Sequence, residues 1–254
     1  MTGVKRRRFV TEPIETDVPG KGGKAENGSP LADLHPLVII CVFIPITLTM
    51  LFARVLFRGM TRNVTELYPM FPFIVYVLFN CLVITAGVSA FHRRLQWRDI
   101  GFCNFRWKDL SLGTAAAAAG VFIVYPAAML LAGAIGLERM KGMDYSLNDP
   151  ANIISAVLIA SIIGPLAEDI IFRGFLLSFL REKYRRTWLT AAGGVLIFTS
   201  VHVFYFGWSG VLFILLWTPL SVGLFIWRKS IYPCLVLHML NNITAYVLVP
   251  ALLH

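Results

Sequence analysis

The fold of this chain is decided by the stretch IGPLAEDIIFRG, residues 163–174. It places two adjacent carboxylates, Glu168 and Asp169, and the guanidinium of Arg173 within a segment that is otherwise largely apolar from residue 153 to residue 180. An ionisable side chain at the depth of the bilayer core costs about 3 kcal/mol on insertion scales. Each of these groups is therefore expected to have a partner or a chemical task.

Helical spacing divides the three charged groups. Asp169 and Arg173 are four residues apart, so on a helix they share one face and can form an ion pair. Glu168 points about 100° away from Asp169 and has no partner nearby in the sequence. Gly164-Pro165 precedes the acidic pair, and a proline inside a helix removes one backbone hydrogen bond and produces a kink. We expect this kink to open a pocket beside Glu168.

The composition is that of a membrane protein. Of 254 residues, 57% are hydrophobic and only 15% are charged, which is far less charge than a soluble domain of this length carries. Several apolar runs are long enough to cross about 30 Å of hydrocarbon. The sequence therefore predicts an all-α, polytopic integral membrane protein, and the first two spans, which hold no acidic residue, are predicted to be scaffold. The seven predicted spans cover residues 36–56, 68–91, 112–137, 153–180, 188–206, 211–227 and 231–253.

The positive charge of the chain is explained by topology. The formal net charge is +9, but most of the basic residues fall before the first span and in every second loop after it. The positive-inside rule then predicts a cytoplasmic N-terminus and a C-terminus on the outside. Residues 1–34 lack apolar periodicity and predict a disordered basic cytoplasmic tail, and residues 35–254 predict one membrane-embedded helical domain. Nucleic acid is not expected as a partner.

Two further spans carry polar groups that could meet Glu168. The fifth holds Phe198-x-x-x-His202, and the seventh holds His238-x-x-x-Asn242, whose two polar side chains share one helix face. At a rise of about 1.5 Å per residue, all four groups lie between about 14 and 24 Å from the cytoplasmic ends of their helices. The sequence therefore predicts that they converge in one layer near the middle of the membrane.

A carboxylate, two imidazoles and a carboxamide in a pocket of low dielectric constant provide what peptide hydrolysis requires. A water between Glu168 and His202 could lose a proton to one of them. His238 and Asn242 could donate hydrogen bonds to the tetrahedral oxyanion, and each such donor contributes about 3 kcal/mol in well-studied enzymes.

In this order on three helices, the motifs Glu168-Asp169-x-x-x-Arg173, Phe198-x-x-x-His202 and His238-x-x-x-Asn242 resemble those of the CPBP family, the CAAX-protease and bacteriocin-processing intramembrane endopeptidases. The resemblance covers roughly residues 95–250. It implies a glutamic-type protease in which Glu168 and His202 activate water, His238 and Asn242 stabilise the oxyanion, and Arg173 orients the acidic pair.

One position departs from the family pattern. The family motif usually has a second glutamate where this chain has Asp169, whose reach is shorter by about 1.5 Å. Asp169 is therefore predicted to be a supporting residue. The expected substrate is a membrane-anchored protein or peptide: a prenylated CAAX tail, a bacteriocin leader or the sorting tail of a surface protein. The expected location is a prokaryotic inner membrane.

Three other functions stay open at this point. No cofactor is expected, but zinc could bind Glu168, His202 and His238 in an intramembrane metalloprotease, although the chain lacks the HExxH signature. The same buried groups could form a proton path in a transporter. A non-catalytic immunity or scaffold protein would have no use for the complete polar set.

Overall fold

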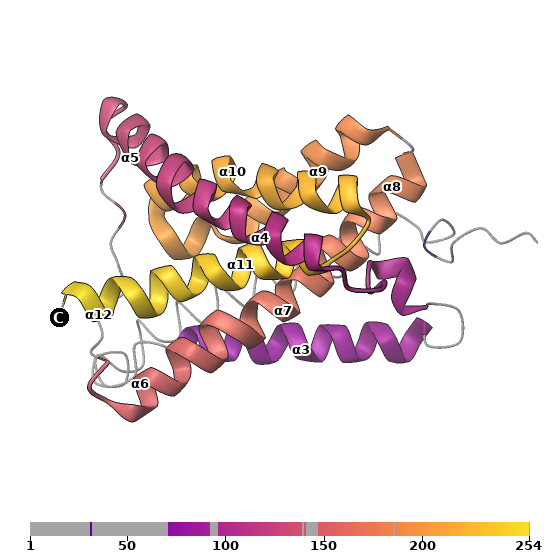
Figure 1. Ribbon diagram of the computed structural model, residues 1–254, viewed down its shortest axis with the longest axis horizontal. Coiled ribbons are helices and arrows are strands. Elements are labelled where there is room, and N and C mark those ends of the chain that lie inside the picture. The colour runs from indigo at the N-terminus through magenta and orange to yellow at the C-terminus, as the bar shows by residue number, and fades with distance from the viewer. Residues whose placement is uncertain are drawn as a thin grey trace, which may run out of the picture.

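The computed structural model describes residues 31, 71–91, 96–138, 140, 147–184 and 186–253. Within these ranges all regular structure is helical, as the composition predicts (Figure 1). The predicted tail, apart from Leu31, and the predicted first span lie outside the described residues. The elements are α3 (Phe71–Phe91), η1 (Trp97–Ile100), α4 (Trp107–Ala119), η2 (Gly120–Val124), α5 (Tyr125–Ala134), α6 (Pro150–Ile154), η3 (Ser155–Ile163), α7 (Gly164–Asp169), η4 (Ile170–Leu177), α8 (Ser178–Tyr184), α9 (Thr187–Val201), α10 (Val203–Arg228), α11 (Tyr232–Ile243), η5 (Thr244–Leu248) and α12 (Val249–Leu253).

Several of these elements join end to end into long helices. Among the described residues, four helices are long and apolar enough to cross a membrane, and two further apolar helices are shorter. The long ones are Trp107–Ala134, Pro150–Tyr184, Phe206–Arg228 and Tyr232–Leu252, and the shorter ones are Ile74–Ala86 and Thr187–Val201. All six lie within or across predicted spans, whereas the number of seven spans and the orientation of the chain stay predictions.

Helix α11 lies at the centre of the bundle. It packs against α4 on one side and against η3, α7 and α10 on others, while α3 packs against η3 and α7 (Figure 1). The approach of α4 to α11 depends on Gly113, because a Cβ atom there would lie 2.6 Å from the carbonyl oxygen of Pro233. Glycine at this position thus lets two helices pack with their backbones close together.

The helix that carries the acidic pair is irregular on both sides of it. The π-helical segments η3 and η4 flank the short α-helical piece α7, which holds Glu168 and Asp169. The N–H of Gly164 bonds to the carbonyl of Ile159, five residues back, as in a π-helix. At Gly164-Pro165, where the sequence predicts a kink, the helix is thus widened into a π-helical turn.

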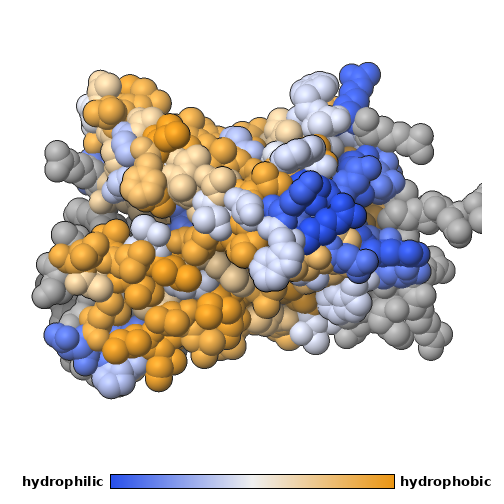
Figure 2. Space-filling model, viewed as in Figure 1, coloured by the Kyte–Doolittle hydropathy of each residue, from blue (hydrophilic) through white to orange (hydrophobic). Residues whose placement is uncertain are grey.

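The surface of the bundle matches a lipid environment. Large apolar side chains such as Phe122, Leu130 and Leu252 are each more than three-quarters exposed. Figure 2 shows apolar residues across most of the visible face, with hydrophilic residues gathered mainly at the end where η1 and α8 lie. By contrast, Glu168, Asp169 and Arg173 are buried inside the bundle.

Candidate active site

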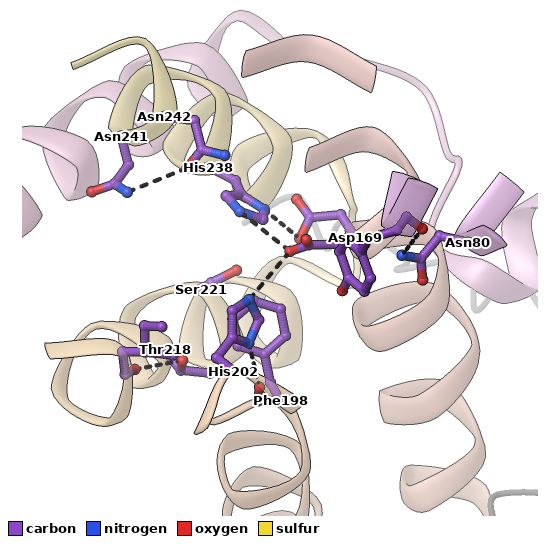
Figure 3. Close-up of polar contacts among 12 residues, drawn as sticks. Asn80, Asp169, Phe198, His202, Thr218, Ser221, His238, Asn241 and Asn242 are labelled. Atoms are coloured by element: carbon purple, nitrogen blue, oxygen red, sulfur yellow. Dashed lines mark hydrogen bonds and ion pairs between the residues drawn. The ribbon is translucent and has the colours of Figure 1, made fainter. Parts of the chain in front are cut away.

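Three predicted residues from different parts of the chain meet at one carboxylate oxygen. Glu168 lies on α7, His202 lies at the junction of α9 and α10, and His238 lies on α11. The distance from Glu168 Oε2 is 3.6 Å to His238 Nε2 and 3.9 Å to His202 Nε2. All three side chains are buried. The predicted layer of polar groups is therefore a compact cluster (Figure 3).

The local backbone determines how His202 is oriented. Its Nδ1 lies 2.8 Å from the carbonyl oxygen of Phe198, one turn earlier. A carbonyl can only accept, so Nδ1 carries a hydrogen and Nε2 is the atom that faces Glu168. Helix α9 ends directly before His202, and Gly207 then adopts φ 69° and ψ 177°, a conformation open essentially only to glycine. Gly207 lies within α10, and its conformation lets that helix kink close to His202.

His238 is oriented by Asp169. The distance from its Nδ1 to Asp169 Oδ1 is 3.4 Å, and the same oxygen lies 3.0 Å from Arg173 NH1. The ion pair expected from the spacing of Asp169 and Arg173 is thus present, and Asp169 has a second partner that the spacing did not indicate. The Arg173 Nε donates to Ser221 Oγ at 3.0 Å, and the guanidinium stacks 4.0 Å above the Phe198 ring. Arg173 therefore supports both Asp169 and the residue that orients His202.

Asn242 lines the same cavity, but its side chain bonds to η3 and to Asn241 and not to the acidic pair. Its Nδ2 donates to the backbone carbonyl of Ala160 in η3 at 2.9 Å. Its Oδ1 accepts from Asn241 Nδ2 at 3.5 Å (Figure 3). The structure thus brings Asn242 to the cavity that Glu168, His202 and His238 line, without a direct contact to the carboxylate.

The cavity at this cluster has a volume of about 70 Å³. One water needs roughly 10–15 Å³ of such volume, so water fits beside Glu168. The cavity wall also includes the apolar side chains of Phe206, Phe213, Ile214 and Trp217, and the rings of Phe206 and Trp217 lie next to those of His202 and His238. The site therefore combines a few polar groups with an apolar lining, a common property of sites that bind organic ligands.

Sequence reasoning missed two residues of the second predicted span. Tyr76 and Asn80 of α3 are fully buried, and α3 packs against α7. The side chain of Tyr76 interacts with Glu168 and with Asn80, and Asn80 Nδ2 donates to the Tyr76 carbonyl at 2.9 Å. The description of this span as scaffold is therefore incomplete. The available signal was a Tyr and an Asn four residues apart in an apolar run, the spacing of His238 and Asn242.

Zinc binding by Glu168, His202 and His238 was the alternative use of this cluster. Within the described parts of the chain, no three side chains of His, Cys, Asp or Glu are grouped so that they could hold a metal ion. The two histidines nevertheless donate their Nδ1 hydrogens to acceptors, as metal-binding histidines commonly do. Treatment with a chelator therefore distinguishes a metal site from direct action of these side chains on water.

Comparison with known proteins adds a family to this geometry. A protein-family model described as type II CAAX prenyl endopeptidase Rce1-like matches residues 150–244. No curated protein and no solved structure matches the chain. The matched segment runs from α6 into η5 and holds Glu168, Asp169, Arg173, His202, His238 and Asn242, whereas α3 and α4 lie outside it. Residues 150–244 are thus similar to the Rce1-like type II CAAX prenyl endopeptidase family, and this similarity is consistent with the CPBP family that the three motifs resemble.

Proposed function

We propose that this protein is a glutamic-type intramembrane endopeptidase that hydrolyses a peptide bond in a membrane-anchored or lipidated protein or peptide. One observation carries the proposal. In a segment that matches a protease family, the Nε2 atoms of His202 and His238 both lie within 4 Å of one buried oxygen, Glu168 Oε2. A carboxylate between two imidazoles is suited to moving a proton from water and back.

The reaction begins with a water in the cavity. Glu168, with His202 beside it, takes one proton from this water. The water oxygen then bonds to the carbon of the scissile carbonyl, whose π electrons move onto the carbonyl oxygen. The electrons on the oxyanion then re-form the C=O bond as the C–N bond breaks, and Glu168 returns the proton to the departing amine nitrogen. Proton transfer by a positioned side chain typically contributes a factor of about 100 to 10,000 in rate.

His238 and Asn242 are the proposed donors to the oxyanion. Because Asp169 is an acceptor, the Nδ1 of His238 that faces it carries a hydrogen. His238 then donates from Nε2 only as an imidazolium, which together with Arg173 balances the two carboxylates of Glu168 and Asp169 in charge. In this mechanism Asp169 is a positioning residue for His238, and Asn242 supplies the second donor from Nδ2.

The substrate class is proposed from the apolar wall and the family description. Phe206, Phe213, Ile214 and Trp217 suit a lipid chain or an apolar peptide next to the bond that is cut. The matching family is described as a type II CAAX prenyl endopeptidase, so a prenylated C-terminal peptide is the first substrate to test, ahead of bacteriocin leaders and sorting tails. We place the protein in a prokaryotic inner membrane with seven spans and a cytoplasmic N-terminus.

The proposal is tested with purified protein in proteoliposomes. A farnesylated peptide that ends in a CAAX sequence is added, and release of the C-terminal tripeptide is followed by mass spectrometry. We expect cleavage by the wild type and at least a roughly 1,000-fold loss with Glu168→Gln, as for other groups essential to proton transfer. Glu182→Gln, which changes a carboxylate on α8 outside the cavity, is the matched control and keeps full activity.

Substrates other than CAAX peptides are covered by a second experiment. Protein termini are compared in membrane fractions of cells that carry the wild type or Glu168→Gln at equal protein level. A terminus that is absent in the variant identifies the substrate and the cleavage site. No cleavage of the peptide and no difference in termini would together overturn the proposal.

The two non-proteolytic alternatives give different results with the same residues. A proton-coupled transporter would show uptake into vesicles that Glu168→Gln abolishes. An immunity or scaffold protein would keep its cellular phenotype in a Glu168→Ala, His202→Ala double variant at normal protein level. We expect neither result.

A further inference from the structure

The carbonyl of Ala160 lacks the backbone partner that its helix would normally provide. In η3 the N–H of Gly164 bonds to the carbonyl of Ile159, five residues back. The next bond of this ladder would join the N–H of residue 165 to the carbonyl of Ala160. Residue 165 is proline, which has no N–H. Because Ala160 is fully buried, its carbonyl needs a donor from elsewhere.

That donor is the side chain of Asn242 on α11, whose Nδ2 lies 2.9 Å from the Ala160 oxygen. A carbonyl only accepts, so this contact determines which end of the carboxamide faces η3. The amide nitrogen has two hydrogens, and Ala160 takes one of them. The second hydrogen is left for the cavity that Asn242 lines.

We propose that Pro165 is a positioning residue for Asn242: by removing one backbone N–H, it creates the acceptor that holds the Asn242 amide nitrogen at the cavity. This inference rests on the proposed function, in which Asn242 donates to the oxyanion. It assigns Pro165 a role in hydrogen bonding, in addition to any widening of the helix. With an N–H at residue 165, the Ala160 carbonyl would have a backbone donor, and Asn242 would be free to rotate its amide.

The hydrogen-bond link is tested by thermal unfolding of four proteins: the wild type, Pro165→Ala, Asn242→Ala and the double variant. With Pro165 present, Asn242→Ala leaves the Ala160 carbonyl without a donor, and we expect Tm to fall by about 3 °C. In the Pro165→Ala background, the new N–H can satisfy the carbonyl, and the same Asn242→Ala change shifts Tm by about 1 °C or less.

Pro219→Ala is the matched control for these measurements. Pro219 also lies inside a helix, α10, but it is exposed and does not line the cavity. In the Pro219→Ala background, Asn242→Ala should lower Tm as much as in the wild type. An equal loss of Tm in the wild-type and Pro165→Ala backgrounds would overturn the proposal, and this readout requires no substrate.

Kinetics with the farnesylated CAAX peptide test the consequence for catalysis. Loss of one oxyanion donor typically costs about 100-fold or more in kcat. We expect Pro165→Ala to lower kcat by about 10-fold, a part of that loss, with KM changed less than about 2-fold because ground-state binding is retained. Pro219→Ala should leave both constants unchanged.

The double variant separates positioning from a purely steric role. If Pro165 acts through Asn242, then Pro165→Ala causes no further loss of kcat in an Asn242→Ala background. Equal losses in both backgrounds would overturn positioning through Asn242. If Asn242→Ala alone leaves kcat unchanged, the oxyanion role under the proposed function fails, whereas the Tm measurements still decide whether the hydrogen-bond link exists.

Discussion

Two aspartate–arginine pairs in this protein have the same chemistry and different surroundings. Asp109 Oδ1 on α4 accepts hydrogen bonds from Nε and NH2 of Arg228 on α10, at 3.1 and 2.9 Å. Its Oδ2 accepts from the backbone N–H of Arg106 at 3.0 Å. Asp169 receives Arg173 from one turn further along the same helix, and the same oxygen faces His238. The first pair joins two helix ends, whereas the second pair is shared with the candidate active site.

The two pairs also differ in how far their arginine side chains are exposed to solvent. The side chain of Arg228 is 20% exposed and that of Arg173 is 1% exposed, while both aspartates are buried. Breaking a pair that is buried on both sides typically costs about 3–5 kcal/mol, because one charge is left without compensation. A pair at the surface can be replaced in part by water. We therefore expect the buried Asp169–Arg173 pair to affect both stability and the proposed reaction, and the more exposed Asp109–Arg228 pair to affect stability alone.

The largest effect is expected from replacing Arg173, the arginine of the fully buried pair. Arg173→Met leaves Asp169 buried without its cation and should lower the free energy of unfolding by about 3–5 kcal/mol. Arg228→Met should cost only about 1–2 kcal/mol, because water reaches this position. Thermal unfolding in the same detergent measures both variants. Equal losses would show that burial does not distinguish the two pairs.

The next effect concerns catalysis. Asp169→Asn removes the anionic partner of His238 Nδ1 and should lower kcat/KM for the farnesylated peptide by about 100-fold, as loss of a carboxylate behind a functional histidine commonly does. Asp109→Asn should lower Tm and leave kcat/KM within about 2-fold. If both variants lost activity in proportion to their loss of Tm, Asp169 would have no separate role in the reaction.

A smaller effect is expected from Tyr76 of α3, which packs against the helix that carries Glu168 and Asp169. Tyr76→Phe removes the buried hydroxyl that interacts with Glu168 and should lower kcat by about 10-fold, because the carboxylate proposed to take a proton from water loses a polar neighbour; a 10-fold change in rate is about 1.4 kcal/mol. Tyr125→Phe, which changes an exposed tyrosine of α5, is the matched control. Unchanged kcat in Tyr76→Phe would mean that α3 only packs against the site.

The smallest expected effect is that of metal removal. If Glu168, His202 and His238 act on water directly, prolonged treatment with a strong chelator should leave kcat/KM unchanged within about 2-fold. Loss of activity that zinc restores would assign the three side chains to a metal instead. The Tm of the chelated protein serves as the control for damage by the treatment.

Much of the fold could be predicted because it depends on composition. Apolar runs indicate helices wherever lipid must be faced, and each of the six apolar helices among the described residues lies within or across a predicted span. The pairing of Asp169 with Arg173 also follows from helical spacing alone. The meeting of Glu168, His202 and His238 could be predicted because depth along a helix can be counted. The catalytic roles of these residues stay predictions.

The other contacts of the site could not be predicted, because they depend on how each helix is rotated about its axis and packed against its neighbours, which residue spacing does not encode. The contact of Asp169 with His238 requires a particular rotation of α7 against α11. The bond from Asn242 to Ala160 requires the π-helical ladder of η3, whose existence follows from the whole environment of that helix. Tyr76 was missed because a tyrosine in an apolar span is more often a packing residue, and only the position of α3 beside α7 brings it to Glu168.

The close contact at Gly113 bears on how this domain could be transplanted. Helix α11 carries His238 and Asn242 and rests on α4, which precedes the segment that matches the protease family. A chimera that joined residues 150–244 to a foreign helix would have to retain a glycine at the position of Gly113. Any larger residue would meet the backbone of α11 and shift His238 and Asn242, although every motif residue would still be present.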